Sequence, residues 1–252
     1  MTKTGSQIRI IVEASTKFDR FRKQWGLSIL VDGDVLFDTF SDPKTLSSRM
    51  RRSRVDMSAI RHVVISHDHW DHTGGLWWLL EQNKNCTVYV CANSGENLRE
   101  KIRSCGVKVV EVTGPMKIKD NISSTGEIAG SYAGKPMYEQ ALVINEGEKL
   151  AVITGCSHPG ILEILRTVRG ISDDHIAMVM GGFHLVDKTE EELGNIVRAL
   201  DGIYKVNTIA PFHCTGKQAV EYFKECMPDQ YIKAGTGDSF LFDEDKKIWM
   251  PG

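Results

Sequence analysis

A short segment of the chain concentrates side chains that bind metal ions. Three histidines and two aspartates occur within six residues: His67, Asp68, His69, Asp71 and His72. The segment follows an apolar stretch, 62–66, that we expect to be a buried strand. Imidazole and carboxylate groups suit zinc, iron or manganese. The alternative is a polar loop, but the chain has only eight histidines and three of them in six residues by chance are improbable. The segment therefore predicts a metal site.

The spacing within this segment predicts which side chains share an ion. In extended backbone alternate side chains point to the same face, so His67 and His69 can approach one metal. If the chain turns into a helix after Gly74-Gly75, Asp71 and His72 can reach a neighbouring metal. We expect Asp71 to be both a metal ligand and a catalytic residue.

Two further histidines follow predicted strands. His158 comes just after the strand 150–154, and His213 just after the strand 208–211. Functional loops are commonly placed at such strand ends. A lone histidine there would more often be structural, but the histidine-rich segment needs further ligands, so we expect both to bind metal. The neighbouring Cys156 either coordinates as a thiolate or packs in the interior.

Other polar residues are expected to assist. His184 follows two glycines, whose missing side chains allow close approach of the backbone. We predict that His184 is catalytic as a general acid, with a substrate contact or support of a metal ligand as alternatives. Asp38 is expected to orient a ligand rather than to bind metal. His62 and His175 are interpreted as structural.

These residue types favour hydrolysis. A metal ion lowers the pKa of bound water to roughly 7 and polarises the bond under attack. No Ser-His-Asp array or nucleophile elbow is recognisable in the sequence as a competing hydrolytic apparatus. The leading hypothesis is metal-assisted hydrolysis of a small ester, phosphoester or lactone-like substrate, with one or two Zn²⁺ ions, or with iron or manganese instead.

The segments that must position these residues alternate between strands and helices. Strands are predicted for the ranges 8–13, 27–31, 35–37, 62–66, 87–91, 107–112, 141–144, 150–154, 177–180, 208–211, 231–234 and 239–242. Helices are predicted for the ranges 43–54, 74–83, 94–104, 161–169, 189–204 and 216–226, with Thr189 capping the fifth. The stretch 114–135 forms either a loop over the site or strands without a recognisable pattern. Hairpins mixed with strand–helix units favour two sheets sandwiched by helices.

Bulk composition narrows the partners. The 252 residues are 41% hydrophobic and 25% charged, as in globular proteins. The net charge of -2 gives no general preference for nucleic acid or an acidic membrane. No apolar run approaches the roughly 18 residues of a membrane span, and the N-terminus lacks a signal-peptide core. We expect a cytoplasmic protein with reduced cysteines that acts on a small molecule, with no nucleic-acid or membrane partner.

A basic group lies in the predicted helix 43–54. It consists of Arg49, Arg51, Arg52 and Arg54. These residues spread around a helix rather than along one stripe, which favours a solvated face over a phosphate clamp.

The motifs resemble those of a known superfamily. The run S-H-D-H-W-D-H-T-G-G at 66–75 is similar to the H-x-H-x-D-H signature of the metallo-β-lactamase superfamily, and the run L-F-D-T at 36–39 resembles its upstream strand ending in aspartate. The segments 154–160, 181–185 and 211–216 resemble one branch, described as dihydropteroate-synthase-like or related to ribofuranosylaminobenzene phosphate synthase. The resemblance covers nearly the whole chain. It implies an αββα sandwich of two mixed sheets flanked by helices, formed as one domain by residues 1–252.

The sequence departs from the superfamily pattern at two places. Most members have a metal-bridging aspartate where Gly155-Cys156 stands here. They also have an upstream histidine, whereas the range 88–155 contains none, so His158 is a candidate replacement. These departures leave open whether one or two ions bind.

Other functions remain alternatives. The branch name suggests a transferase or synthase acting on a pterin or ribosyl-phosphate compound. An iron-dependent redox enzyme is a further candidate, although diiron members resemble H-x-E-x-D-H and this chain has His69 at the glutamate position. A nuclease would be expected to have a basic arm or an added domain. A protein that binds a small ligand without turnover is the non-catalytic alternative.

Overall fold

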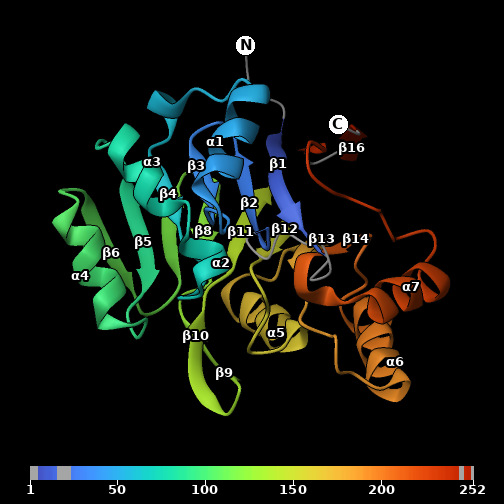
Figure 1. Ribbon diagram of the computed structural model, residues 1–252. Helices are drawn as coiled ribbons and strands as arrows, with labels where there is room; N and C mark the ends of the chain where they lie inside the picture. The colour runs from blue at the N-terminus through green and yellow to red at the C-terminus, as the bar shows by residue number, and fades with distance from the viewer. Residues whose placement is uncertain (1–4, 16–23, 244–246, 251–252) are drawn as a thin grey trace.

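Two β-sheets lie face to face in the computed structural model, which describes residues 5–15, 24–243 and 247–250 (Figure 1). The first sheet has the order β16 (Lys247–Met250), β15 (Ser239–Phe242), β1 (Ser6–Ala14), β2 (Gly26–Val31), β3 (Val35–Phe37), β4 (His62–Val64), β5 (Thr87–Cys91) and β6 (Lys108–Val112). The second has the order β14 (Thr208–Phe212), β13 (His175–Gly182), β12 (Lys149–Thr154), β11 (Leu142–Glu146), β8 (Ile122–Ser124) and β7 (Met116–Lys119). A separate hairpin pairs β9 (Ile128–Tyr132) with β10 (Lys135–Glu139).

Helices cover the outer face of each sheet. On the first sheet lie α1 (Pro43–Arg52), α3 (Leu76–Gln82) and α4 (Glu96–Ser104). On the second lie α5 (Ile161–Ile171), α6 (Glu190–Arg198) and α7 (Lys217–Cys226). A single turn, α2 (Trp70–Thr73), stands between β4 and α3. Both sheets contain parallel and antiparallel pairs, so the predicted αββα sandwich with two mixed sheets is confirmed.

The layers follow from side-chain alternation along the strands. In β12, Ala151 and Ile153 face the core between the sheets, whereas Leu150 and Val152 face the helices α5 to α7. A strand that is apolar on both faces must be covered on both. The same alternation in the other central strands produces three apolar layers and fixes the order helix, sheet, sheet, helix.

Parallel pairing brings several strand ends to one edge. β3 pairs parallel with β4, and β12, β13 and β14 form a parallel set. The carboxyl ends of parallel strands meet at the same edge of a sheet, where loops can converge. Asp38 follows β3, and the histidine-rich segment follows β4, while the segments with Cys156, His184 and His213 follow β12, β13 and β14.

Some predicted elements are corrected. The strand predicted for 62–66 ends at Val64; His67 lies in a bend, whereas His69 has an extended backbone and is the N-cap of α2. The helix predicted after Gly74-Gly75 is preceded by α2, so Asp71 and His72 are already helical. The range 231–234 forms no strand beyond an isolated bridge between Tyr231 and Ile209, because its neighbours have no pairing partner in the described sheets.

Other details extend the prediction. The stretch 114–135 forms strands rather than a loop, namely β7, β8, β9 and the start of β10. Helix 189–204 becomes α6 followed by a π-helical turn, 199–203, and its predicted cap is confirmed as a capping box between Thr189 and Glu192. Among the described residues, every helix is too short or too polar to cross a membrane.

Candidate metal centre

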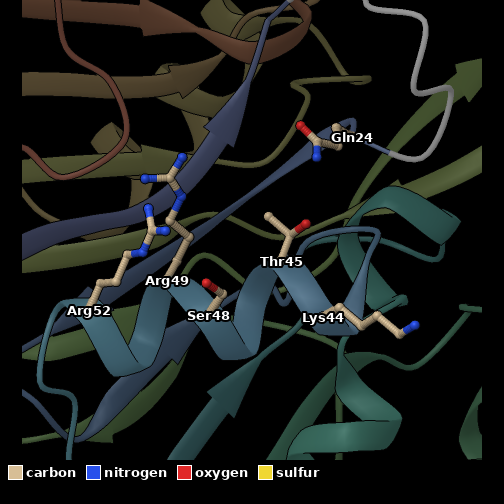
Figure 2. A pocket seen from close by; sticks show the side chains of 6 residues that line it. All are labelled: Gln24, Lys44, Thr45, Ser48, Arg49 and Arg52. Carbon is tan, nitrogen blue, oxygen red and sulfur yellow. The ribbon is translucent and has the colours of Figure 1, made fainter.

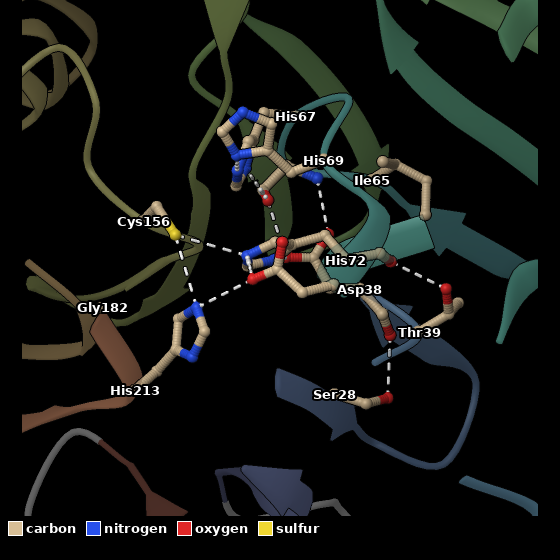
Figure 3. A network of polar contacts seen from close by, with 12 residues as sticks. Ser28, Asp38, Thr39, Ile65, His67, His69, His72, Cys156, Gly182 and His213 are labelled. Carbon is tan, nitrogen blue, oxygen red and sulfur yellow. Dashed lines mark hydrogen bonds and ion pairs between the residues drawn. The ribbon is translucent and has the colours of Figure 1, made fainter. Parts of the chain in front are cut away.

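Four candidate ligand atoms form one tight group where the strand ends meet. They belong to Asp71, His72, Cys156 and His213, which are all buried. Asp71 Oδ2 lies 3.2 Å from His72 Nε2 and 3.4 Å from His213 Nε2. Cys156 Sγ lies 3.3 Å from His72 Nε2 and 3.4 Å from His213 Nε2 (Figure 3). The carboxylate oxygen and the sulfur therefore face the same two imidazole nitrogens.

The spacing of these four atoms fits a zinc ion. Ligand atoms bound to tetrahedral zinc lie roughly 3.3–3.6 Å apart, given the usual Zn–N, Zn–O and Zn–S bond lengths. The measured separations of 3.2, 3.3, 3.4 and 3.4 Å are close to this range. The donor set of two imidazoles, a carboxylate and a thiol is one that zinc accepts.

A second group consists of three histidines. His67, His69 and His158 place one ring nitrogen each within 4.8 Å of one another. His67 Nε2 lies 3.0 Å from His69 Nδ1, and the His158 ring centroid lies 4.8 Å from that of His67. Both ring nitrogens of His158 are buried without a hydrogen-bond partner among the described residues. Such an unpaired buried nitrogen is costly, and a metal ion would satisfy it.

The two groups adjoin, with Cys156 at their junction. The rings of His67 and His72 are 4.2 Å apart between centroids. Cys156 belongs to the first group and also lies within ligand distance of His158 and His184. The thiol therefore occupies the place between two histidine clusters at which the superfamily pattern has a bridging aspartate. His158, although it follows β12, lies beside His67 and His69, where the replacement for the missing upstream histidine was expected.

His184 lies on the far side of His158. The two ring centroids are 4.6 Å apart, and His184 Nδ1 is buried without a partner in the described part of the chain. A hydrogen bond with Cys214 raises the pKa of His184, which favours its protonated form. His184 is thus adjacent to the candidate ligands and able to carry a proton.

Charge is unevenly distributed among these side chains. Burial lowers the pKa of His158 to about 3 and holds that of His67 well below its usual value, so both imidazoles are neutral. Burial also opposes protonation of His72, but the nearby Asp71 and Asp38 raise its pKa well above the usual value. Against the opposing effect of burial, His72 and His213 lower the pKa of Asp71. A cation that binds here replaces the proton of His72.

Asp38 orients the site, as the sequence predicted. Its Oδ2 accepts hydrogen bonds from His72 Nδ1 and from Ser66 Oγ, both at 2.6 Å, and its Oδ1 accepts from the Ser66 backbone N–H at 2.7 Å. His213 is oriented in the same manner, because its Nδ1 donates to the Ala14 carbonyl at 3.1 Å. In both rings this leaves Nε2 directed at the group.

Glu139, at the end of β10, is a supporting residue that the sequence did not reveal. Its buried carboxylate accepts backbone hydrogen bonds from Cys156 and Ser157 at 2.8 Å and from His158 at 2.7 Å. Burial raises the pKa of Glu139, and the three N–H donors oppose that shift. One glutamate therefore fixes the loop that carries Cys156 and His158. No spacing or motif distinguishes it in the sequence.

Glycines allow the loops to approach so closely. A Cβ on Gly155 would lie 2.2 Å from Ser66 Oγ, and one on Gly182 would lie 2.6 Å from Cys214 Sγ. Both distances are far below contact, so only glycine fits. Asp38, Ser157, His184 and His213 also have positive φ angles of 49–62°, which L-residues rarely adopt. Such backbone strain concentrates at functional sites.

An aromatic ring lies over the second group. Tyr132, at the end of β9, is 44% exposed, and its ring centroid lies 4.7 Å from that of His69 and 5.1 Å from that of His158. The β9–β10 hairpin that carries it projects from the sandwich (Figure 1). Trp25 packs on the first group, 4.8 Å from His213 between ring centroids.

Known proteins of one superfamily are similar to this chain in sequence and in structure. Residues 34–233 match the beta-lactamase superfamily domain. The 7,8-dihydropterin-6-methyl-4-(beta-D-ribofuranosyl)-aminobenzene-5'-phosphate synthase of Methanocaldococcus jannaschii is 26% identical over 269 residues, covering 88% of this chain and 91% of the relative. Tm1679, a metal-dependent hydrolase of the beta-lactamase superfamily, has a TM-score of 0.78 and 28% identity, with 95% of this chain and 100% of that chain covered.

A more distant structure agrees in fold. The metallo-beta-lactamase fold protein YhfI from Bacillus subtilis has a TM-score of 0.69 and 13% identity, with 94% of this chain and 99% of that chain covered. The family match spans most of the chain and includes every candidate ligand, from His67 to His213. The chain therefore belongs to the beta-lactamase superfamily.

Proposed function

We propose that the protein is a metal-dependent hydrolase acting on a small ester, phosphoester or lactone-like substrate. The observation that carries this proposal is the compact group of Asp71, His72, Cys156 and His213 directly beside a second group of three histidines. The metal-dependent hydrolase Tm1679 has a similar structure and supports the assignment.

The ligand assignment is part of the proposal. Asp71, His72, Cys156 and His213 would hold one Zn²⁺ ion, and His67, His69 and His158 would hold a second, with iron or manganese as alternatives. When bound, such an ion lowers the pKa of water to roughly 7 and polarises the bond that is cleaved.

The residues of the chain divide the remaining tasks. Asp38 and Glu139 hold His72 and the 156–158 loop in place. Asp71 accepts hydrogen bonds from His72 and His213; against the effect of burial, these two residues lower its pKa and keep its carboxylate ionised. His184 donates the proton that the leaving group requires, because its Nδ1 has no other partner among the described residues and its pKa is raised.

Hydrolysis of model substrates tests this assignment. We would screen p-nitrophenyl esters, phosphodiesters and lactones with the purified protein, Asp71→Asn and His184→Gln. We expect Asp71→Asn to abolish turnover. We expect His184→Gln to slow substrates with poor leaving groups by about 10²–10⁴-fold, and those with good leaving groups much less. Turnover that survives complete metal removal would contradict the proposal.

A second candidate is a synthase acting on a pterin or ribosyl-phosphate compound. The Methanocaldococcus jannaschii synthase, which is similar over 88% of this chain, favours it. In the synthase reaction an amine would attack the substrate as the nucleophile, whereas in hydrolysis the nucleophile is water. Release of pyrophosphate from a pterin pyrophosphate that requires an added arylamine identifies the synthase, whereas release at the same rate without the amine identifies the hydrolase.

The proposed substrate is a small molecule in both cases, and the proposed location is the cytoplasm. The balanced charge and the absence of a membrane-crossing helix among the described residues support a reaction without nucleic acid or membrane.

A further inference from the structure

A polar hollow of about 270 Å³ opens along α1, outside the metal centre. Among the described residues, its lining consists of Gln24, Lys44, Thr45, Ser48, Arg49 and Arg52 (Figure 2). Three of these side chains are cationic and the other three are polar, and no carboxylate or apolar side chain is among them. A hollow of this composition is built for an anion rather than for an apolar ligand.

The cations in the hollow have no ion-pair partner among the described residues. Within the ranges that the structure describes, Lys44, Arg49 and Arg52 form no ion pair, whereas other basic residues such as Arg99 and Arg166 pair with glutamates. Arg49 and Arg52 are three residues apart on one helix and point to the same side (Figure 2). Because no carboxylate among the described residues balances the charges of Arg49 and Arg52, these two side chains attract an added anion.

The carboxylate at the start of α1 is already engaged. Asp42, the N-cap of α1, accepts hydrogen bonds at Oδ2 from the Thr45 backbone N–H at 2.8 Å and from Thr45 Oγ1 at 2.7 Å. The hydroxyl proton of Thr45 is therefore already donated to the N-cap residue Asp42. Hydrogen-bond donors for an anion come from the two guanidinium groups, the Lys44 ammonium and the Ser48 hydroxyl.

Two consecutive residues join the hollow to the metal centre. Gln24 lines the hollow, and the next residue, Trp25, packs its ring on His213 at 4.8 Å between centroids. The Trp25 backbone N–H donates to Ser41 Oγ at 3.2 Å, and Ser41 directly precedes the α1 cap. The hollow and the metal centre are thus linked through two consecutive residues of the chain, Gln24 and Trp25.

We propose that this hollow binds a phosphate group carried by the substrate of the metal centre, away from the bond that reacts. The proposal rests on the proposed function, since it extends that site. A guanidinium group can donate two hydrogen bonds to two oxygens of one phosphate. Two guanidinium groups and an ammonium therefore suit a phosphate dianion better than they suit a singly charged carboxylate. The basic residues of α1 were expected to form a solvated face. Arg51 and Arg54 lie outside the hollow lining, whereas Arg49 and Arg52 line it and would hold the phosphate.

Calorimetric titration of the purified metal-loaded protein tests the proposal. The probes are inorganic phosphate, ribose 5-phosphate and ribose. We expect both phosphates to bind and ribose not to bind. We expect Arg49→Gln/Arg52→Gln to weaken the affinity for ribose 5-phosphate at least about tenfold, because two charge-assisted contacts are lost. The matched control is Arg51→Gln on the same helix, whose side chain contacts Ser47 instead; it should bind as the unmodified protein does.

Phosphate can also bind at the metals, so Asp71→Asn is titrated in parallel. Retained affinity in Asp71→Asn together with loss in Arg49→Gln/Arg52→Gln supports the proposal. Unchanged affinity in the double arginine variant, or loss in Asp71→Asn, would overturn it. Binding of inorganic phosphate without ribose 5-phosphate would overturn the assignment to a substrate-borne phosphate. These titrations measure no turnover, so a failure of the hydrolase proposal would be seen separately.

Discussion

At the scale of single residues, Cys156 is the feature that sets this site apart from the superfamily pattern. Its sulfur lies 3.3–3.4 Å from two ring nitrogens that also face Asp71. Burial raises the pKa of this thiol, so it is protonated without a metal. A coordinating cation would remove that proton and turn a costly buried group into a ligand.

We predict that Cys156→Ser lowers the metal content from two ions per chain to one. A neutral hydroxyl is a poorer zinc ligand than a thiolate, whereas the three histidines of the second group are untouched. Elemental analysis of anaerobically purified protein measures the ratio. The control is Cys86→Ser, which alters a buried thiol in the apolar layer that contains α3. This variant should retain two ions. Equal metal content in both variants would show that Cys156 only packs.

Glu139 carries the second prediction at this scale. Its carboxylate holds three consecutive N–H groups, at Cys156, Ser157 and His158. Glu139→Gln replaces one acceptor oxygen by an NH₂ group that faces a donor. We expect a loss of about 1–3 kcal/mol in the free energy of unfolding and a decrease in metal affinity of about 10–100-fold.

Urea unfolding and competition with a zinc chelator measure these two effects. Glu127→Gln is the control, since Glu127 also accepts two N–H bonds, both from Asn93, but away from the ligands. It should alter metal affinity little. An equal loss in both variants would mean that Glu139 has no special role at the metal centre.

At the scale of elements, the β9–β10 hairpin packs tightly against the His158 loop at Gly130. A Cβ on Gly130 would lie 2.6 Å from Pro159 N and 2.8 Å from the His158 carbonyl carbon, both backbone atoms that cannot rotate away. The hairpin and the His158 loop therefore fit together only without a side chain here, and Tyr132 reaches the histidines from that position.

We predict that Gly130→Ala separates the hairpin from the His158 loop. Overpacking of this kind costs about 1–3 kcal/mol, and the displaced Tyr132 should raise the KM of a substrate identified by the hydrolase screen. Gly170→Ala is the matched control, because nothing lies within 4 Å of its Cβ on α5, and it should stabilise the helix by up to about 1 kcal/mol. Thermal unfolding compares the two; equal midpoints would refute the close fit.

At the scale of the whole molecule, the sequence predicted most of the sandwich because its strands are apolar on both faces and its motifs follow strand ends. The strands β7 to β10 had no recognisable pattern, since their outer residues are exposed and polar and glycines interrupt them. The range 231–234 is apolar enough for a strand but finds only one partner residue, Ile209. Whether a segment forms a strand depends on whether a sheet edge is free to pair with it, and the sequence of the segment alone does not determine this.

The candidate site was predictable to the extent that its residues stand in motifs. The predicted ligands fall into two groups, and Asp38 orients His72 as expected. Glu139 and Tyr132 were missed because they reach the site from a hairpin whose place depends on tertiary packing. The sequence also did not reveal that Arg49 and Arg52 form no ion pair with the described residues, since the distance to a carboxylate is not visible in helix periodicity.

Both sheets contribute candidate ligands, so metal binding should stabilise the whole sandwich. His67 and His69 follow β4 of the first sheet, whereas Cys156 and His213 follow strands of the second. An ion that binds only the folded chain at a hundredfold excess over its Kd adds about 2.7 kcal/mol. For a chain of this length we expect chelation to lower the Tm by about 5–10 °C, and zinc to restore it. Calorimetry before and after dialysis against a chelator measures this; an unchanged Tm after verified metal loss would show that the ion does not bind the folded chain in preference to the unfolded one.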